Sequence, residues 1–169
     1  RSWVPAGEAL EQVAEKVRSG ARPDFITLSG SGEPTLHLEI GKIIREIKSL
    51  TDTPVAVLTN GTMLWDAAVR EALSAADLVV PSLDAVDEES FRRINRPHPA
   101  ISFEFFLDGL RRFAEGRRGK LWLEVFILAG INDDDVFAES LGRITETIPA
   151  ERIQLNTAVR PPACAEARA

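Results

Sequence analysis

Apolar residues recur along the chain at two different spacings. In four segments they return every three or four residues, which is the period of an α-helix with one buried face. These segments are residues 10–17, 40–47, 103–110 and 137–148. The spacing predicts four amphipathic helices.

Short, continuously apolar runs lie between these helices. They cover residues 25–28, 55–58, 78–80, 121–128 and 153–155. Runs without polar alternation are typical of strands buried on both faces of a parallel sheet. Two shorter helices are predicted between the strands, one at 66–74 with Asp66 as its N-cap and one at 87–94 after Asp84. Because strands and helices alternate, we expect an α/β fold with a helix-covered parallel sheet.

Composition narrows the class of protein. The 169 residues, 44% of them hydrophobic, match one ordinary domain. No apolar run is long enough to cross a bilayer and no secretory signal is visible, so we expect a soluble, cytoplasmic protein with no membrane partner. The net charge of −6 argues against binding of nucleic acid by the whole surface. Cys164 is the single cysteine and cannot build a multi-cysteine metal site, so we expect no metal ligands in this chain.

The first predicted helix, at residues 8–19, has no strand before it. A parallel α/β domain ordinarily begins with a strand that leads into its first helix. The chain also begins at Arg1 rather than at a methionine. We therefore expect a truncated core domain over 1–162, with its first strand missing upstream, followed by a polar tail over 163–169.

Small and polar residues follow every predicted strand. In parallel α/β folds ligands bind at the carboxyl ends of the strands. The turns at these ends are residues 29–34, 59–62, 81–84, 129–133 and 156–162. Any one of them also fits an ordinary glycine-rich connection or a helix cap. Their occurrence together on one rim favours a ligand site.

The turn after the first strand points to the kind of ligand. Gly30 and Gly32 let the backbone approach a ligand closely, and the Glu33 carboxylate suits an ammonium group or hydroxyls. A phosphate-binding loop would instead present amides and a Lys or Arg, and Glu33 would repel a phosphate. The turn therefore predicts a polar clamp.

Four motifs in order extend this interpretation: DFITLSGSGEPTLH, VAVLTNGTMLW, VVPSLDA and LWLEVFILAGIND. Together they resemble the radical S-adenosylmethionine (radical SAM) superfamily over most of the chain. The likeness is closest to the branch of iron–sulfur oxidoreductases that includes the wybutosine-type tRNA-modifying enzymes. The resemblance implies a partial (β/α)6 TIM-like barrel of parallel strands, with the first strand missing, that binds S-adenosylmethionine.

The resemblance also assigns cofactor-binding residues. The turn at Gly30, Ser31, Gly32, Glu33 and Pro34 would match the family's Gly-Gly-Glu turn, which holds the amino group of the cofactor. Asn60 would line the cofactor site, and Ser82 and Asp84 would match the strand end that contacts the ribose. Leu128 and Gly130 would lie near the adenine, although Gly130 is the only residue of that family pattern that is identical here. The catalytic residues are not identified by this resemblance.

One family motif is absent. The CxxxCxxC loop, whose thiolates ligate three irons of a [4Fe–4S] cluster, has no counterpart, and Cys164 cannot replace it. The resemblance thus implies a full-length enzyme that cleaves S-adenosylmethionine reductively to a 5′-deoxyadenosyl radical and abstracts hydrogen from an unknown substrate. Its reductant would be a flavodoxin or ferredoxin, and tRNA is a substrate by analogy alone. This chain alone would be inactive.

Alternatives stay open at this point. A non-catalytic domain that binds a nucleoside or a protein partner would keep the same fold, and a phosphate-binding barrel lyase or isomerase fits less well because the strand ends lack lysine. Glu124 faces either solvent or the barrel lumen, where it would meet substrate. Arg96 and Arg160 are candidates for the rim of the site, with a stiffened loop as the simpler explanation for Arg96.

Overall fold

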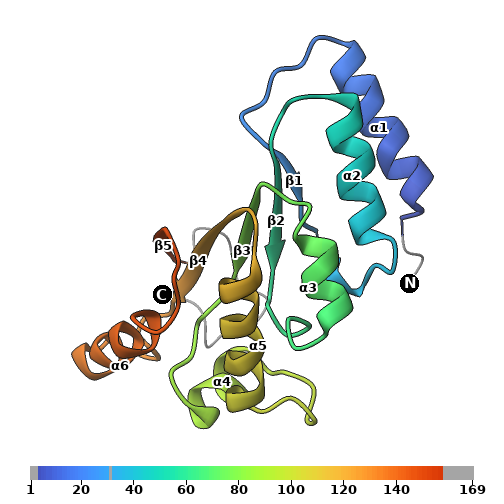
Figure 1. The fold of residues 1–169 in the computed structure, drawn as a ribbon. Coiled ribbons are helices and arrows are strands. Elements are labelled where there is room, and N and C mark those ends of the chain that lie inside the picture. Colours follow the sequence, from blue (N-terminus) through green and yellow to red (C-terminus); the bar gives the residue numbers. More distant parts are fainter. Residues whose placement is uncertain (1–3, 31, 158–169) are drawn as a thin grey trace.

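The computed structural model describes residues 4–30 and 32–157. Along them, helices and strands alternate (Figure 1). The helices are α1 (Ala6–Arg18), α2 (Ile40–Leu50), α3 (Ala67–Leu73), α4 (Glu88–Ile94), α5 (Phe103–Gly116) and α6 (Asp135–Thr145), with a single 3-10 turn, η1 (Pro34–Leu36). The strands are β1 (Ile26–Leu28), β2 (Val55–Thr59), β3 (Leu78–Pro81), β4 (Lys120–Ile127) and β5 (Arg152–Thr157). All the helices and strands expected within these residues are confirmed; their ends lie within four residues of the expected ones, except that α5 continues six residues beyond 110.

Asp66 is the N-cap of α3, as predicted, and the structure shows Asp87 as the N-cap of α4. The Asp66 side chain accepts a hydrogen bond from the Ala68 N–H at the start of α3. Asp87 caps α4 through a reciprocal capping box with Ser90. These caps satisfy amide groups that a first helical turn otherwise leaves unpaired.

The strands form one parallel sheet in the order β1-β2-β3-β4-β5. Because each strand pairs with the next one in the chain, right-handed crossovers place the helices on the same side of the sheet. Figure 1 shows the helices gathered on one side. This arrangement is an arc of a (β/α) barrel rather than a doubly wound sheet.

The hydrophobic core fills the space between the sheet and the helices. Strand residues Val57, Val79 and Leu121 are buried against helix residues such as Ile44 and Leu110. Successive side chains of a strand point to opposite faces of the sheet, so only every second one enters this core. The strands are continuously apolar in sequence because aliphatic residues also occupy the other face.

The other face of the sheet is built in rows. One row is apolar and contains Leu58, Val80 and Trp122, with the Arg152 guanidinium stacked 4.2 Å from the Trp122 ring centroid. The next row toward the carboxyl ends is polar and consists of Asn60, Ser82, Glu124 and Gln154. The register therefore presents a band of polar side chains above an apolar floor.

The ladder between β3 and β4 is interrupted at Pro81. The Leu83 N–H donates to the Glu124 carbonyl at 2.8 Å, so the amide two residues earlier would also face β4. Pro81 has no N–H to donate. Regular pairing stops after Val79 and resumes as an isolated bridge between Ser82 and Glu124.

Within the described part of the chain, the helices all fall short of the length and apolarity needed to cross a bilayer. The expected division into a core over 1–162 and a tail over 163–169 stays a prediction, because residues 158–169 lie outside the described part.

Candidate functional site

A cavity of about 390 Å³ opens at the carboxyl ends of the strands. This volume lies within the range of small-molecule sites. Its lining includes six of the residues expected in the cofactor site: Gly30, Gly32, Glu33, Pro34, Asn60 and Ser82. The other described residues of the lining are Ser29, Leu58, Thr59 and Glu124. The structure thus brings the ends of β1, β2 and β3 together with Glu124 of β4 around one space.

Glu33 joins the first two strand ends. Its Oε1 accepts hydrogen bonds from the Thr35 N–H at 3.0 Å, the Thr35 hydroxyl at 2.6 Å and the Thr59 hydroxyl at 2.5 Å. Its Oε2 accepts from the Asn60 N–H at 2.7 Å. One carboxylate therefore caps η1 and fixes the turn after β2, and Oε2 keeps most of the remaining acceptor capacity.

The turn after β2 has a defined shape. The Asn60 Oδ1 accepts from the Thr62 N–H at 2.9 Å and from the Thr62 hydroxyl at 2.7 Å. Gly61 adopts a φ of 74°, and a Cβ added there would lie 2.9 Å from Phe106 Cε2. The turn thus packs directly on α5, and this contact holds Asn60 at the cavity.

Asp84 is not part of the cavity lining. Its side chain is buried, with Oδ1 accepting from the Phe126 N–H at 2.8 Å and Oδ2 from the Asn95 amide at 2.9 Å. Burial raises the pKa of the Asp84 carboxyl above its ordinary value of 3.8, while the hydrogen bonds from Phe126 and Asn95 lower it and the charge of Glu124 raises it further. Asp84 ties the end of β3 to β4 and α4.

Asn132 continues this network, and sequence reasoning missed it. It is 1% exposed. Its amide donates to the carbonyls of Phe126 at 2.9 Å and Asp84 at 3.3 Å, and its Oδ1 accepts from the Leu128 N–H at 2.6 Å. The Gly-Ile-Asn-Asp motif could have identified Asn132, because a buried Asn side chain ordinarily forms hydrogen bonds, often with backbone groups. Leu128 and Gly130, expected near adenine, lie in the turn that Asn132 shapes, and neither lines this cavity.

The structure shows which way Glu124 faces, which the sequence left open between solvent and the barrel lumen. Its side chain is half-buried and lines the cavity rather than facing bulk solvent. Oε1 accepts from the Asn156 amide, and the Ser82 hydroxyl lies 3.5 Å from Oε2. Glu124 therefore closes the side of the cavity opposite Glu33.

Other candidate residues are placed differently. Ser31, Arg160 and Cys164 lie outside the described residues. Arg96 follows α4 with a φ of 47°, the left-handed conformation that often terminates a helix. Among the described residues there is no group of His, Cys, Asp and Glu that could hold a metal ion.

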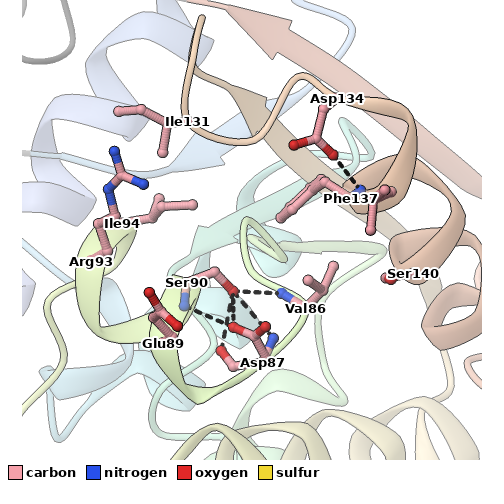
Figure 2. A pocket seen from close by; sticks show the side chains of 11 residues that line it. Val86, Asp87, Glu89, Ser90, Arg93, Ile94, Ile131, Asp134, Phe137 and Ser140 are labelled. Carbon is pink, nitrogen blue, oxygen red and sulfur yellow. Dashed lines mark hydrogen bonds between the residues drawn. The ribbon is translucent and has the colours of Figure 1, made fainter.

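A second cavity, of about 240 Å³, lies in the helix layer between α4 and α6 (Figure 2). Its lining includes Glu89 and two acidic helix caps, as the dashed lines in Figure 2 show: the Asp87 carboxylate accepts from the Ser90 N–H, and the Asp134 carboxylate accepts from the Phe137 N–H. These groups are committed to the backbone, so the cavity at the strand ends is the better candidate site.

Comparisons with known proteins agree with this geometry. A family profile described as "Radical SAM superfamily" matches residues 3–138. The chain is 40% identical to a protein named GTPase Obg from Brachyspira hyodysenteriae over 94% of its own length, and 37% identical to a UPF0026 protein from Synechocystis over 94%. It spans 23% and 58% of these two relatives.

A solved structure supports the fold. A radical SAM methyltransferase from Sphaerobacter thermophilus superposes with a TM-score of 0.69 at 22% identity, covering 96% of this chain and 50% of that one. At this identity the likeness shows the fold alone. The expected α/β fold, part of a TIM-like barrel, is confirmed.

Proposed function

The chain belongs to the radical SAM superfamily, and from this premise we propose that the cavity at the strand ends binds S-adenosylmethionine. The observation that carries the proposal is the convergence of Glu33, Asn60 and Ser82 on one cavity of ligand-binding size. S-adenosylmethionine carries an ammonium, a carboxylate and two ribose hydroxyls, so a site for it needs both acceptors and donors.

The residues present fit this cofactor. Glu33 Oε2 takes one internal hydrogen bond from the described residues and keeps capacity for the ligand ammonium. Asn60 commits its oxygen to Thr62, so its amide hydrogens are available to the ligand carboxylate. The Ser82 hydroxyl, with only a long contact to Glu124, suits a ribose hydroxyl. Asp84 then acts as a positioning residue that fixes β3 against β4, rather than as a direct ligand contact.

An iron–sulfur cluster does not fit the residues of this sequence. The superfamily implies such a cluster, and a [4Fe–4S] cluster with one open iron needs three thiolates, whereas the chain contains one cysteine. We propose that this chain alone does not cleave S-adenosylmethionine. Reductive cleavage, hydrogen abstraction and an electron donor such as a flavodoxin or ferredoxin belong to the proposed activity of the full-length enzyme.

The role of this chain is therefore binding and orientation. Glu33, through its bonds to Thr59 and Asn60, fixes two strand ends before ligand arrives, which lowers the entropy lost on binding. Leu58, which lines the cavity, belongs to the apolar row with Val80 and Trp122, and charge-assisted hydrogen bonds are stronger beside such an apolar surface than in bulk water.

Isothermal titration calorimetry of the chain with S-adenosylmethionine tests this proposal. We expect saturable binding that Glu33→Ala and Glu33→Gln both weaken by at least about tenfold, the effect of one charge-assisted hydrogen bond. Glu139→Ala, on the exposed face of α6, serves as the control and leaves affinity unchanged. Circular dichroism of each variant separates a loss of binding from a loss of fold.

Two results would count against the proposal. Equal affinities of the wild type and both Glu33 variants would remove Glu33 from the site. Equal affinity of the wild type for adenosine and for S-adenosylmethionine would favour the alternative of a nucleoside-binding domain, because adenosine lacks the amino-acid head that Glu33 is proposed to hold.

A further inference from the structure

Glu124 lies in the same cavity as the proposed cofactor head but at a distance from it. Asn60, Ser82 and Glu124 occupy one row on three neighbouring strands. At the spacing of parallel strands, Glu124 is roughly 10 Å from Asn60 across the sheet. A cofactor head held at Glu33 and Asn60 therefore leaves Glu124 for another group.

The two carboxylates of the cavity differ in their hydrogen bonding. Glu33 accepts four hydrogen bonds from the described residues. Glu124 accepts one short bond from Asn156 and one contact from Ser82 at 3.5 Å, the outer limit of a hydrogen bond. An ionised carboxylate accommodates about four donors. Glu124 thus has unused acceptor capacity that faces the cavity.

The surrounding charges favour a cationic donor. The described residues that line the cavity include two carboxylates and no Lys, Arg or His. Asp84 adds a third carboxyl group close enough to Glu124 to interact with it electrostatically. Arg152 does not offset this charge directly, because its guanidinium stacks on Trp122 and forms no ion pair with Glu124.

We propose that Glu124, held by Asn156, is a recognition subsite for a cationic nitrogen group, an ammonium or guanidinium, on the substrate of the full-length enzyme. This inference rests on the proposed function, since it assumes that the cofactor occupies the Glu33 side of the cavity. It also predicts that anionic substrates are rejected, because two carboxylates line a partly enclosed space.

Three probes with the same butyl chain, planar head groups of similar size and different charge test the subsite. Butylguanidinium is cationic, butylurea is its neutral counterpart and pentanoate is anionic. Ligand-observed NMR and calorimetry measure their binding to the chain, with and without saturating S-adenosylmethionine. The variant Glu124→Gln removes the charge and keeps the side-chain shape, and Glu139→Gln on the surface of α6 is the matched control.

We expect the wild type to bind butylguanidinium at least about tenfold more tightly than butylurea and to reject pentanoate. Glu124→Gln should abolish this preference and change the affinity for S-adenosylmethionine by less than about threefold. Glu139→Gln should behave as the wild type.

The proposal is overturned if the wild type binds none of the probes or binds the charged and neutral ones equally. It is also overturned if S-adenosylmethionine displaces butylguanidinium, or if Glu124→Gln weakens both ligands alike, because Glu124 would then belong to the cofactor site. A wild type that selects butylguanidinium but does not bind S-adenosylmethionine would support the cation subsite and refute the proposed function.

Discussion

At the scale of single residues, Asp84 is the most constrained titratable group of the site. It is 9% exposed, and both of its carboxylate oxygens accept hydrogen bonds from the end of β4 and from α4. Asn95, which donates to it, has a buried Oδ1 without a hydrogen-bond partner in the structure. Together the two side chains leave one buried acceptor, Asn95 Oδ1, unsatisfied.

Asp84 should make stability depend on pH. Because burial raises the pKa of its carboxyl in the folded state above 3.8, its contribution to stability is full below pH 3.8 and is lost as pH rises through the folded pKa. Asp84→Asn removes this titration, and rotation of the Asn95 amide lets its unpaired Oδ1 accept from the new side-chain amide. The free energy of unfolding of the variant minus that of the wild type should therefore increase as pH increases.

Urea unfolding between pH 4 and pH 8 measures this difference between variant and wild type. The exposed Asp108→Asn on α5 provides the control and should show no comparable trend. A difference between Asp84→Asn and the wild type that stays flat, or shrinks as pH increases, would contradict a buried Asp84 carboxyl with a raised pKa.

The pKa of Asp77, which lies at the amino ends of the strands, is shifted in the opposite direction to that of Asp84. Burial acts to raise its pKa, but hydrogen bonds from Lys48 and from the Val55 N–H outweigh it, so the pKa lies below 3.8. Its contribution is present above pH 3.8 and is lost as pH falls through the folded pKa. Asp77→Asn should destabilise the chain by about 0.5–1 kcal/mol at pH 7, the value of a half-exposed pair.

Urea unfolding in a series extended from pH 7 down to pH 3 checks this prediction. The destabilisation by Asp77→Asn should diminish as pH is lowered toward 3, where the wild-type carboxylate also loses its charge. A destabilisation that is independent of pH would assign the effect to packing instead of to the charge of Asp77.

At the scale of elements, the turn after β2 controls the site. Gly61→Ala forces a positive φ on a residue with a side chain and presses a methyl group against Phe106. We expect a loss of about 1–3 kcal/mol of unfolding free energy and weaker binding of S-adenosylmethionine, because Asn60 moves with the turn. Thermal unfolding and calorimetry measure the two effects.

Gly142→Ala is the matched control for this substitution. Gly142 lies in α6, and a Cβ there would meet nothing within 4 Å. Alanine in a helix is favoured over glycine by about 0.5–1 kcal/mol, so this variant should be more stable and bind normally. A Gly61→Ala protein with wild-type stability and affinity would show that the turn is not held by α5.

The comparison of sequence and structure also belongs to the scale of elements. Apolar periodicity and the predicted cap Asp66 were sufficient to place helices and strands, because both depend on local chemistry. The strand ends also identified Glu33, Asn60 and Ser82, since parallel strands bring these ends to one rim.

The direction of a side chain at a strand end was harder to predict. Asp84 turns toward Asn95 and Phe126, which depends on how β3 meets β4 beyond the interruption at Pro81. Glu124 faces the cavity because Ser82 and Asn156 flank it on neighbouring strands. Apart from the Asp84–Asn95 hydrogen bond, these contacts join residues more than 30 positions apart, which periodicity does not report.

At the scale of the whole molecule, the two ends of the sheet have different roles. At the amino ends of the strands, charged side chains such as Asp77 and Glu151 bind backbone amides and hold neighbouring elements together. At the carboxyl ends, polar side chains surround a cavity and keep some of their hydrogen-bonding capacity. The fold therefore separates stability from ligand binding along the strand direction.

Amide chemical-shift mapping tests the central claim most directly. In a titration of the 15N-labelled chain with S-adenosylmethionine, the account predicts the largest shifts at the Gly32, Asn60 and Ser82 amides, which lie at the cavity. The Val136 and Ser140 amides, beside the cavity between α4 and α6, should not move. Shifts confined to Val136 and Ser140, or no saturable shifts at the strand ends, would contradict the assignment of the cofactor site.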